Sequence, residues 1–280
     1  MFPPSPPATA TAGVAVSRWH AAADSISTDD LVAVEEPLEI RVGGRSVAVV
    51  MRTPGHDREL AAGFLLSEGV IRRRDDLLDL LACRDQDSGQ SGNVIDAVVA
   101  PHVSVDFDQL TRHVFSASSC GVCGKATIDA VFRAGVPQVP SETHFDPQVL
   151  AALPAALAAA QPGFGATGGV HASALVTPDG RLEIVREDVG RHNALDKVLG
   201  WALHHDSLPL DRHALLVSGR ISFELVQKAL VAGIPLIAGI GAPSSLAVDC
   251  ARQANQTLIG FLRPDRMNVY THAARVRATG

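Results

Sequence analysis

Residues 214–262 read ALLVSGRISFELVQKALVAGIPLIAGIGAPSSLAVDCARQANQTLIGFL, and this stretch indicates the class of fold. Two segments within it, 222–232 and 244–256, carry apolar residues at helical spacing. Three short apolar runs have the composition of buried strands, and they are 214–218, 235–238 and 257–262. Strands that alternate with helices of about a dozen residues predict a mostly parallel sheet covered by helices.

The pattern extends upstream and predicts an α/β domain over residues 126–275. Its further elements are strands at 170–177 and 181–187 and helices at 145–161 and 192–204. Pro178-Asp179-Gly180 supplies the turn between the two strands. The first of these helices is predicted in spite of Pro154.

The first part of the chain predicts a small α+β domain over residues 26–115. Its signals are a hairpin over 32–52 around Gly43-Gly44, a helix over 58–68 with Asp57 as N-cap, and a strand pair over 94–105. Residues 1–25 begin with a run rich in proline, alanine and threonine, and we expect them to form a disordered tail.

The composition restricts the class of function. A net charge of −6 argues against broad, unspecific binding of nucleic acid. The start of the chain lacks the basic and apolar regions of a signal peptide, and the apolar stretch 229–242 is too short to span a bilayer. Four cysteines in 280 residues are too few for a disulfide scaffold. The sequence therefore predicts a soluble, cytoplasmic protein with neither a nucleic-acid nor a membrane partner.

Two of the cysteines, Cys120 and Cys123, stand in the run Ser118-Ser119-Cys120-Gly121-Val122-Cys123-Gly124-Lys125. The flanking glycines permit backbone conformations closed to other residues, so residues 116–125 are predicted to be a loop that presents sulfur. A neighbouring cation such as Lys125 favours the reactive thiolate. The motif indicates sulfur chemistry, redox work or metal binding. Zinc fits it poorly, because there is one cysteine pair and no H-x-E motif precedes it.

Three arginine-bearing turns stand where predicted strands end: Gly190-Arg191-His192, Gly219-Arg220 and Arg263-Pro264-Asp265-Arg266. Ligands of open α/β sheets collect outside the carboxyl ends of the strands, and a guanidinium group suits phosphate oxygens. These turns predict a pocket for a nucleotide-like or pyrophosphate-bearing ligand. The alternative is that the arginines are solvated or paired with Asp188 and Glu224.

The segment 187–197 packs seven polar groups around one predicted strand–helix junction. Helix capping by Asp188 or Asn193 explains some of them. The density exceeds what capping needs, so we expect the segment to form part of a site.

In combination these motifs resemble those of the formate dehydrogenase accessory sulfurtransferases, the FdhD family. The resemblance covers roughly residues 30–272, and one departure is His56, where the family pattern has an acidic residue. The segments that carry it are 52–55, 64–69, 118–124, 169–171, 187–197, 218–224, 241–247 and 261–266.

The resemblance implies a function. Such proteins accept sulfur as a persulfide from a cysteine desulfurase and pass it to the molybdenum bis-guanine-dinucleotide cofactor, before that cofactor enters formate dehydrogenase. The persulfide cysteine corresponds to Cys120, with Cys123 as its partner. The cofactor-binding segment corresponds to Phe261, Leu262, Arg263, Pro264, Asp265 and Arg266, to which the turns add Arg191, His192 and Arg220.

The resemblance also implies a homodimer, a C-terminal domain of the three-layer, cytidine-deaminase-like α/β type, and neither a metal nor a cofactor of the protein's own. Two hypotheses of other classes remain. One is a non-catalytic chaperone for the molybdenum cofactor, and the other is a zinc-dependent hydrolase of deaminase-like fold.

Overall fold

The computed structural model describes residues 10–21, 23–84, 91–107, 110, 138–140 and 142–278. Cys120 and Cys123, with the whole predicted loop 116–125, lie outside these residues.

The C-terminal lobe is built on a six-stranded sheet with the strand order β12-β11-β10-β9-β7-β8. Its strands are β7 (His171–Val176), β8 (Leu182–Asp188), β9 (Ala214–Val217), β10 (Leu236–Gly239), β11 (Thr257–Gly260) and β12 (Asn268–Thr271). Only β9, β10 and β11 run parallel, whereas β7, β8 and β12 are antiparallel to their neighbours. The expectation of a mostly parallel sheet is wrong, because short connections, residues 177–181 and 261–267, rather than crossover helices join β7 to β8 and β11 to β12.

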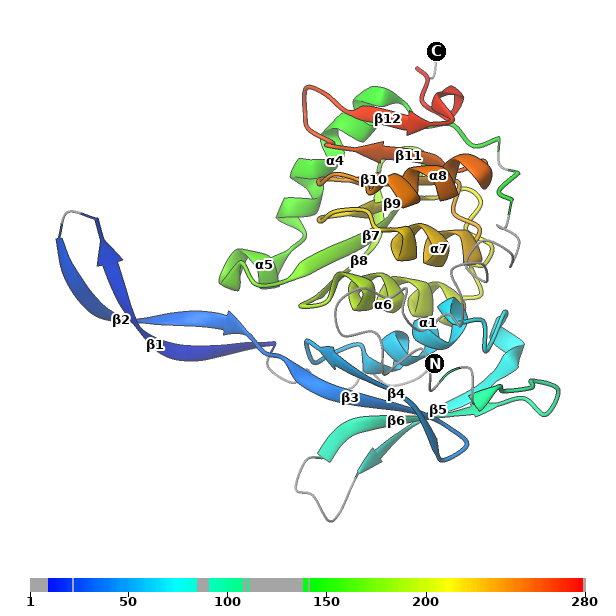
Figure 1. Cartoon of the computed structure of the whole chain (residues 1–280), viewed down its shortest axis with the longest axis horizontal. Helices are drawn as coiled ribbons and strands as arrows, with labels where there is room; N and C mark the ends of the chain where they lie inside the picture. The colour runs from blue at the N-terminus through cyan, green and yellow to red at the C-terminus, as the bar shows by residue number, and fades with distance from the viewer. Residues whose placement is uncertain are drawn as a thin grey trace.

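Helices cover both faces of this sheet (Figure 1), which gives three layers. Helices α6 (Arg191–His204), α7 (Phe223–Val231) and α8 (Ser245–Gln253) lie on one face. Helix α4 (Pro147–Ala159) packs on the other face, through Leu150, Leu153 and Leu157, and continues despite Pro154. The short helix α5 (Pro162–Thr167) leads into β7, and η2 (Ala273–Arg275) follows β12.

The N-terminal lobe has a four-stranded sheet with the order β4-β3-β6-β5, backed by helix α1 (Asp57–Ser67). Its strands are β3 (Glu36–Val42), β4 (Arg45–Arg52), β5 (Leu77–Arg84) and β6 (Ser91–Val99), and η1 (Arg74–Asp76) precedes β5. The hairpin around Gly43-Gly44 is confirmed. The predicted strand pair over 94–105 is wrong, because β6 is a single strand that pairs with β5 and β3. The N-cap of α1 is His56 rather than Asp57, which is the first helical residue.

The two lobes share one hydrophobic core, because α1 packs directly on α6. A Cβ atom at Gly63 would overlap the backbone of Asp196, and a Cβ atom at Gly200 would overlap the backbone of Glu59. The two glycines thus let the helix backbones approach more closely than side chains would permit. Together the lobes form the predicted fold class, an α+β lobe followed by a three-layer α/β lobe.

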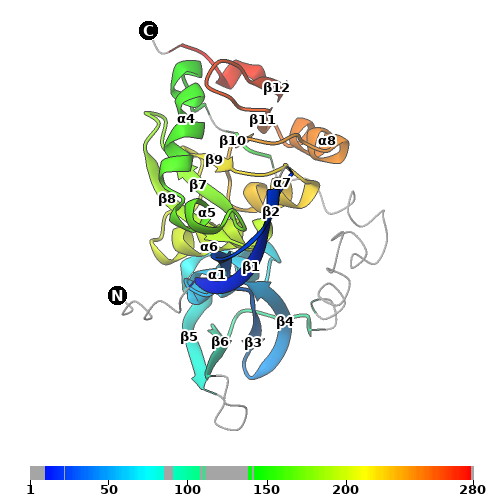
Figure 2. The same cartoon turned by 90° about the vertical axis from the view of Figure 1, so that its left-hand side faces the viewer.

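Strands β1 (Thr11–His20) and β2 (Ala23–Ala33) form a hairpin that projects from the body beside α5, clearest when Figures 1 and 2 are compared. It corrects the expectation of a disordered tail over residues 1–25 at residues 11–20 and 23–25, whereas residues 1–9 lie outside the described chain. The two strands satisfy each other's backbone hydrogen bonds from Thr11↔Ala33 to His20↔Ala23. The hairpin buries few side chains, so apolar patterning gave no signal for it.

Candidate functional site

One edge of the C-terminal sheet collects the chain segments that the sequence analysis singled out. The carboxyl ends of β9, β10 and β11 lie at this edge. Because β7 and β8 run in opposite directions, the start of β7 and the end of β8 lie there too, with His171 opposite Asp188. The three predicted arginine turns therefore all open on the same side of the molecule, which we call the ligand edge. It comprises His171, Arg191, His192, Arg220 and residues 261–266.

Backbone hydrogen bonds join the turns of the ligand edge. The Gly241 amide donates to the Gly219 carbonyl at 3.0 Å, and the Phe261 amide donates to the Gly241 carbonyl at 3.0 Å. A Cβ atom at Gly241 would lie 2.8 Å from the Gly219 oxygen, so this approach requires glycine. The turns after β9, β10 and β11 consequently form one fixed surface.

The charges of Arg191, His192 and Arg220 converge on His171. Burial lowers the pKa of His171 below its ordinary value of 6.5, and the charges of Arg191, His192 and Arg220 lower it further. Arg191 also has a buried Nε that makes no hydrogen bond within the described chain. A buried donor without an acceptor is costly, so an acceptor on a bound ligand would stabilise it.

The acidic side chains near this edge are already paired. Asp188 forms an ion pair of 2.7 Å with Lys197, and both side chains are buried. Glu224 forms an ion pair of 2.8 Å with Nε2 of His192, and this hydrogen bond lowers the pKa of Glu224 in spite of its burial. Among the described residues no ion pair joins Arg191 or Arg220 to either carboxylate. Pairing of Arg191 and Arg220 with Asp188 and Glu224 is therefore wrong, whereas solvation of the exposed Arg220 and Arg266 stays an alternative to ligand binding.

The two arginines of the turn 261–266 differ in their surroundings. The Arg263 guanidinium donates to the carbonyls of Ile240 at 2.7 Å and Leu262 at 2.8 Å. Its amide also closes the turn on the Arg266 carbonyl at 2.8 Å. The Arg266 side chain is 71 % exposed, with Asp265 3.4 Å away. Arg263 thus holds the turn, whereas Arg266 is available to a ligand.

Phe261 contributes an exposed ring to the same turn, with φ 52. This left-handed conformation is uncommon for a bulky residue. Leu262, in contrast, is fully buried and contributes packing only.

Most of the polar groups in the segment 187–197 also have a structural role, and its place in a site stays a prediction. Glu187 accepts from the amides of Gly163 and Phe164, each at 2.8 Å. Asn193 donates to the Met51 carbonyl at 2.7 Å and to Asp188 at 3.0 Å.

Three polar groups of this segment, Asp188, Asp196 and Lys197, join the lobes. Asp188 accepts from the Thr53 amide at 3.1 Å, and Lys197 donates to the Thr53 carbonyl at 2.9 Å. Asp196 pairs with Lys228 at 2.7 Å and accepts from Ser67 at 3.0 Å. Only Arg191 and His192 of the segment face the ligand edge.

The site analysis adds three residues to the predicted set: His171, Ser222 and Glu224. Ser222 Oγ lies 3.3 Å from Nε2 of His192, so His192 is held between a hydroxyl and a carboxylate. His171 was assigned no place at this edge, because that place follows from the antiparallel run of β7. The turn Pro178-Asp179-Gly180 was recognised, but it fixes the direction of β7 relative to β8 only and not relative to β9.

Neither a metal centre nor a membrane span is found in the part of the chain that the structure describes. No group of three or more His, Cys, Asp and Glu side chains is arranged there to hold a metal ion. Likewise, none of the described helices combines the length and the apolar character that crossing a membrane requires.

Comparison with known proteins agrees with the motifs. The model of the FdhD/NarQ family matches residues 33–277. A sulfur carrier protein FdhD from Streptomyces coelicolor is 52% identical over 266 residues, which cover 93% of this chain and 94% of that protein. A protein of the same name from Mycobacterium tuberculosis is 50% identical, with 92% and 96% covered.

A solved structure extends the likeness to the fold. The crystal structure of a protein from Desulfotalea psychrophila, described as a formate dehydrogenase accessory protein, superposes with a TM-score of 0.73. The two chains are 25% identical, and the match covers 95% of this chain and 99% of the other.

Proposed function

The chain belongs to the FdhD/NarQ family, and from this premise we propose that it is a sulfur carrier that acts as a sulfurtransferase in the maturation of formate dehydrogenase. The names of its relatives, sulfur carrier protein and formate dehydrogenase accessory protein, support the role. The finer proposal is that Cys120 and Cys123 carry the sulfur and that the ligand edge holds the acceptor.

Loading is a transfer of sulfur between two cysteines. The Cys120 thiolate attacks the terminal sulfur of a persulfide on a cysteine desulfurase. A new bond forms between Cys120 Sγ and that sulfur, the sulfur–sulfur bond on the desulfurase breaks, and the desulfurase cysteine leaves as a thiolate. No net oxidation occurs, so the step needs no further reactant.

Delivery uses the second thiol. The Cys123 thiolate attacks Cys120 Sγ, a disulfide forms, and the terminal sulfur leaves as hydrosulfide toward the metal of the molybdenum bis-guanine-dinucleotide cofactor. A thiol reductant then restores both cysteines. Spacing of two intervening residues supports this exchange, because it is the spacing of dithiol motifs.

The observation that carries the acceptor site is the buried, unpaired Nε of Arg191 beside Arg220 and His171. The cofactor ends in two guanine nucleotides, so its phosphates are the anions that such a site would hold. Arginine suits phosphate oxygens because of its fixed fork of donors. The exposed Phe261 ring and Arg266 stand on the same edge.

The test distinguishes the role of the two cysteines, which carry sulfur, from that of the ligand edge, which binds the acceptor. Cys120→Ala, Cys123→Ala and Arg266→Ala are compared for two properties, persulfide loading by a desulfurase with cysteine and binding of GDP. We expect the cysteine variants to bind GDP and Arg266→Ala to load sulfur, while all of them fail to activate formate dehydrogenase. Full activation by the double variant Cys120→Ala/Cys123→Ala would exclude the sulfurtransferase function. Failure of a folded Arg266→Ala to load would show that loop and edge act as one site.

The same experiment addresses the remaining hypotheses. A chaperone without sulfur chemistry would bind GDP but show no persulfide on the 116–125 peptide by mass spectrometry. A zinc-dependent hydrolase would contain about one zinc ion per chain in metal analysis of the purified protein.

A further inference from the structure

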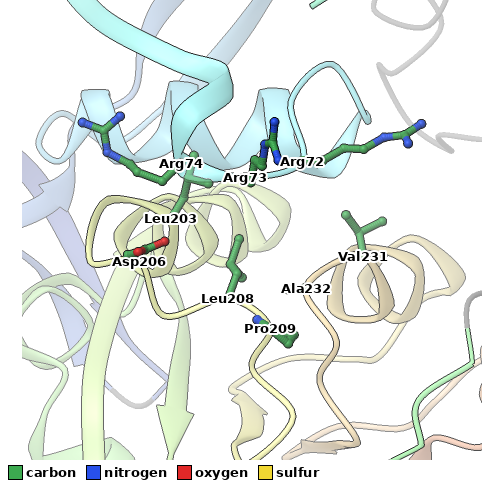
Figure 3. A pocket seen from close by; sticks show the side chains of 9 residues that line it. All are labelled: Arg72, Arg73, Arg74, Leu203, Asp206, Leu208, Pro209, Val231 and Ala232. Carbon is green, nitrogen blue, oxygen red and sulfur yellow. The ribbon is translucent and has the colours of Figure 1, made fainter.

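A groove on the opposite end of the molecule has no part in the function proposed so far. It is a cavity of about 280 Å³ between η1 and the ends of α6 and α7. We call it the arginine groove, and its lining comprises Arg72, Arg73, Arg74, Leu203, Asp206, Leu208, Pro209, Val231 and Ala232. Figure 3 shows the three arginines in a row above apolar side chains, with Arg72 and Arg74 extending in opposite directions.

The position of the arginine row is fixed by the buried Asp76. Its carboxylate accepts from the backbone amides of Arg72 at 2.8 Å and Arg73 at 3.2 Å. Arg73 Nε also lies 3.3 Å from Asp76, and Arg74 donates to the Leu77 carbonyl at 2.6 Å. The exposed Arg72 makes no side-chain hydrogen bond or ion pair within the described residues. The row is therefore held in place while one of its guanidinium groups stays available.

The charge of the groove is opposite to that of the chain. The lining contains three arginines and one carboxylate, Asp206, and Asp76 behind the row pairs with Arg73, in a protein whose net charge is −6. A structural role explains part of this charge, because cations near the carboxyl ends of α6 and α7 complement the helix dipoles. Such a role does not explain the apolar side chains on the floor of the groove. That floor includes Val231, which is 43 % exposed. A surface with a cationic rim and an apolar floor fits an acidic segment that carries a large apolar side chain.

The groove lies far from the ligand edge. Arg191 is the first residue of α6 and lies at the ligand edge, whereas Leu203 lies in the last turn of the same helix and lines the groove. The ligand edge and the groove are therefore separated by most of a 14-residue helix, which is about 20 Å long. The ends of α6, α7 and α8 share the edge of the sheet where β9, β10 and β11 begin. After the cysteine pair the described chain resumes at residues 138–140, and it does so at this edge, where the Val139 amide donates to the Ala254 carbonyl at 3.0 Å.

We propose that the arginine groove docks the protein that donates persulfide sulfur, through an acidic segment of that protein. This inference rests on the proposed function. Loading would then take place at the end of the molecule that carries residues 138–140, where the described chain resumes after the cysteines. Delivery would use the opposite, arginine–histidine edge. The two partners would not compete for one surface.

The test measures the rate of persulfide loading against the concentration of the desulfurase, at low and high salt. The variants are Arg72→Glu, which reverses the available charge, and Val231→Asp, which places a charge on the floor. Arg181→Glu is the matched control, because Arg181 is 62 % exposed in the turn between β7 and β8 and is not among the residues that line the groove. Circular dichroism checks that each variant is folded.

We expect Arg72→Glu to raise the apparent KM for the desulfurase about ten-fold at low salt with little change in kcat, because the variant loses a charged contact and places a carboxylate opposite the acidic segment. The difference should shrink in high salt. Val231→Asp should raise KM in both salts, and Arg181→Glu should behave as the wild type.

A second donor separates this proposal from the proposed function. Glutathione persulfide needs no docking surface, so it should load all variants equally. An unchanged KM for Arg72→Glu and Val231→Asp would overturn the docking proposal while leaving the sulfur carrier intact. Absence of loading from either donor in the wild type would instead overturn the proposed function.

Discussion

At the residue scale, the turn 261–266 contains two arginines with different tasks, and substitution should separate them. Arg266→Ala should weaken GDP binding about ten-fold or more, because a charge-assisted hydrogen bond contributes roughly 1.5–3 kcal/mol. Its melting temperature should hardly change, because the side chain is 71 % exposed. Arg263→Ala should lower both properties, since Arg263 holds the carbonyls of Ile240 and Leu262. Calorimetry and thermal unfolding check this, and unchanged GDP affinity in both variants would move the ligand elsewhere.

His171 makes ligand binding depend on pH. In the free protein its pKa lies below 6.5, first through burial and then through the charges of Arg191, His192 and Arg220. A phosphate bound to the arginines would offset those charges and raise this pKa. The complex then binds more protons than the free protein, so affinity should rise as the pH falls through the interval between the two pKa values.

Calorimetry of GDP binding in two buffers of different ionisation enthalpy measures this proton uptake. His171→Asn keeps a polar side chain without the titration, and it should take up fewer protons than the wild type. Protonation of the phosphate itself is common to both proteins and cancels in the comparison. Equal uptake in both would mean that His171 does not sense the ligand.

The site residues show what sequence reasoning reaches at this scale. Arg191, His192 and Arg220 were predicted to meet because strand ends gather ligands, and the structure brings them together. The sequence could not predict that Arg263 holds the turn while Arg266 is exposed. This difference depends on which guanidinium group the folded turn brings close to the carbonyls of Ile240 and Leu262. Asp188 and Lys197 were grouped with a site for a similar reason, since a buried ion pair and a functional cluster have the same composition.

At the scale of elements, the contact between α1 and α6 depends on glycine. Gly63→Ala should destabilise the protein by at least roughly 1–3 kcal/mol, because overpacking forces two helix backbones apart. Gly165→Ala in α5 is the matched control, since its new methyl group would meet open space. Alanine is also the better helix former, so the control should be neutral or slightly stabilising. Urea unfolding gives both values, and equal midpoints would contradict the close approach of the helices.

The elements that sequence patterns missed are those with weak or local signals. Every helix predicted within the described residues is present, and two of them, α4 and α8, begin at the side-chain caps Asp146 and Ser244. Strand β12 was missed because it is mostly not buried and forms no apolar run, unlike the equally short β9, β10 and β11, and β5 was missed because it follows an arginine-rich turn. Parallel strands were inferred from the alternation of strands and helices. This inference is correct for β9, β10 and β11, but β7 runs antiparallel to β9.

At the scale of the whole molecule, the sequence predicted two domains, whereas one core runs through both lobes. Buried polar contacts reinforce the junction. Lys197 pairs with Asp188 at 2.7 Å and reaches the Thr53 carbonyl of the other lobe at 2.9 Å. Arg186 donates to Glu59 at 2.5 and 2.8 Å. A boundary of this kind cannot be read from composition, because the junction is made by side chains from distant parts of the chain.

The lobes should therefore unfold together. Trp201 lies in α6 beside the junction, and in a Trp19→Phe background it is the sole tryptophan. Its fluorescence and the far-ultraviolet circular dichroism should report the same urea midpoint. Lys197→Met leaves Asp188 as an unpaired buried charge and should cost about 3–5 kcal/mol. Because the shared core remains, the two probes should still coincide in this variant. Adding Asp188→Asn removes the unpaired charge, so the double variant should recover part of the loss. Two separate transitions in the wild type would show that the lobes are independent domains, as the sequence alone suggested.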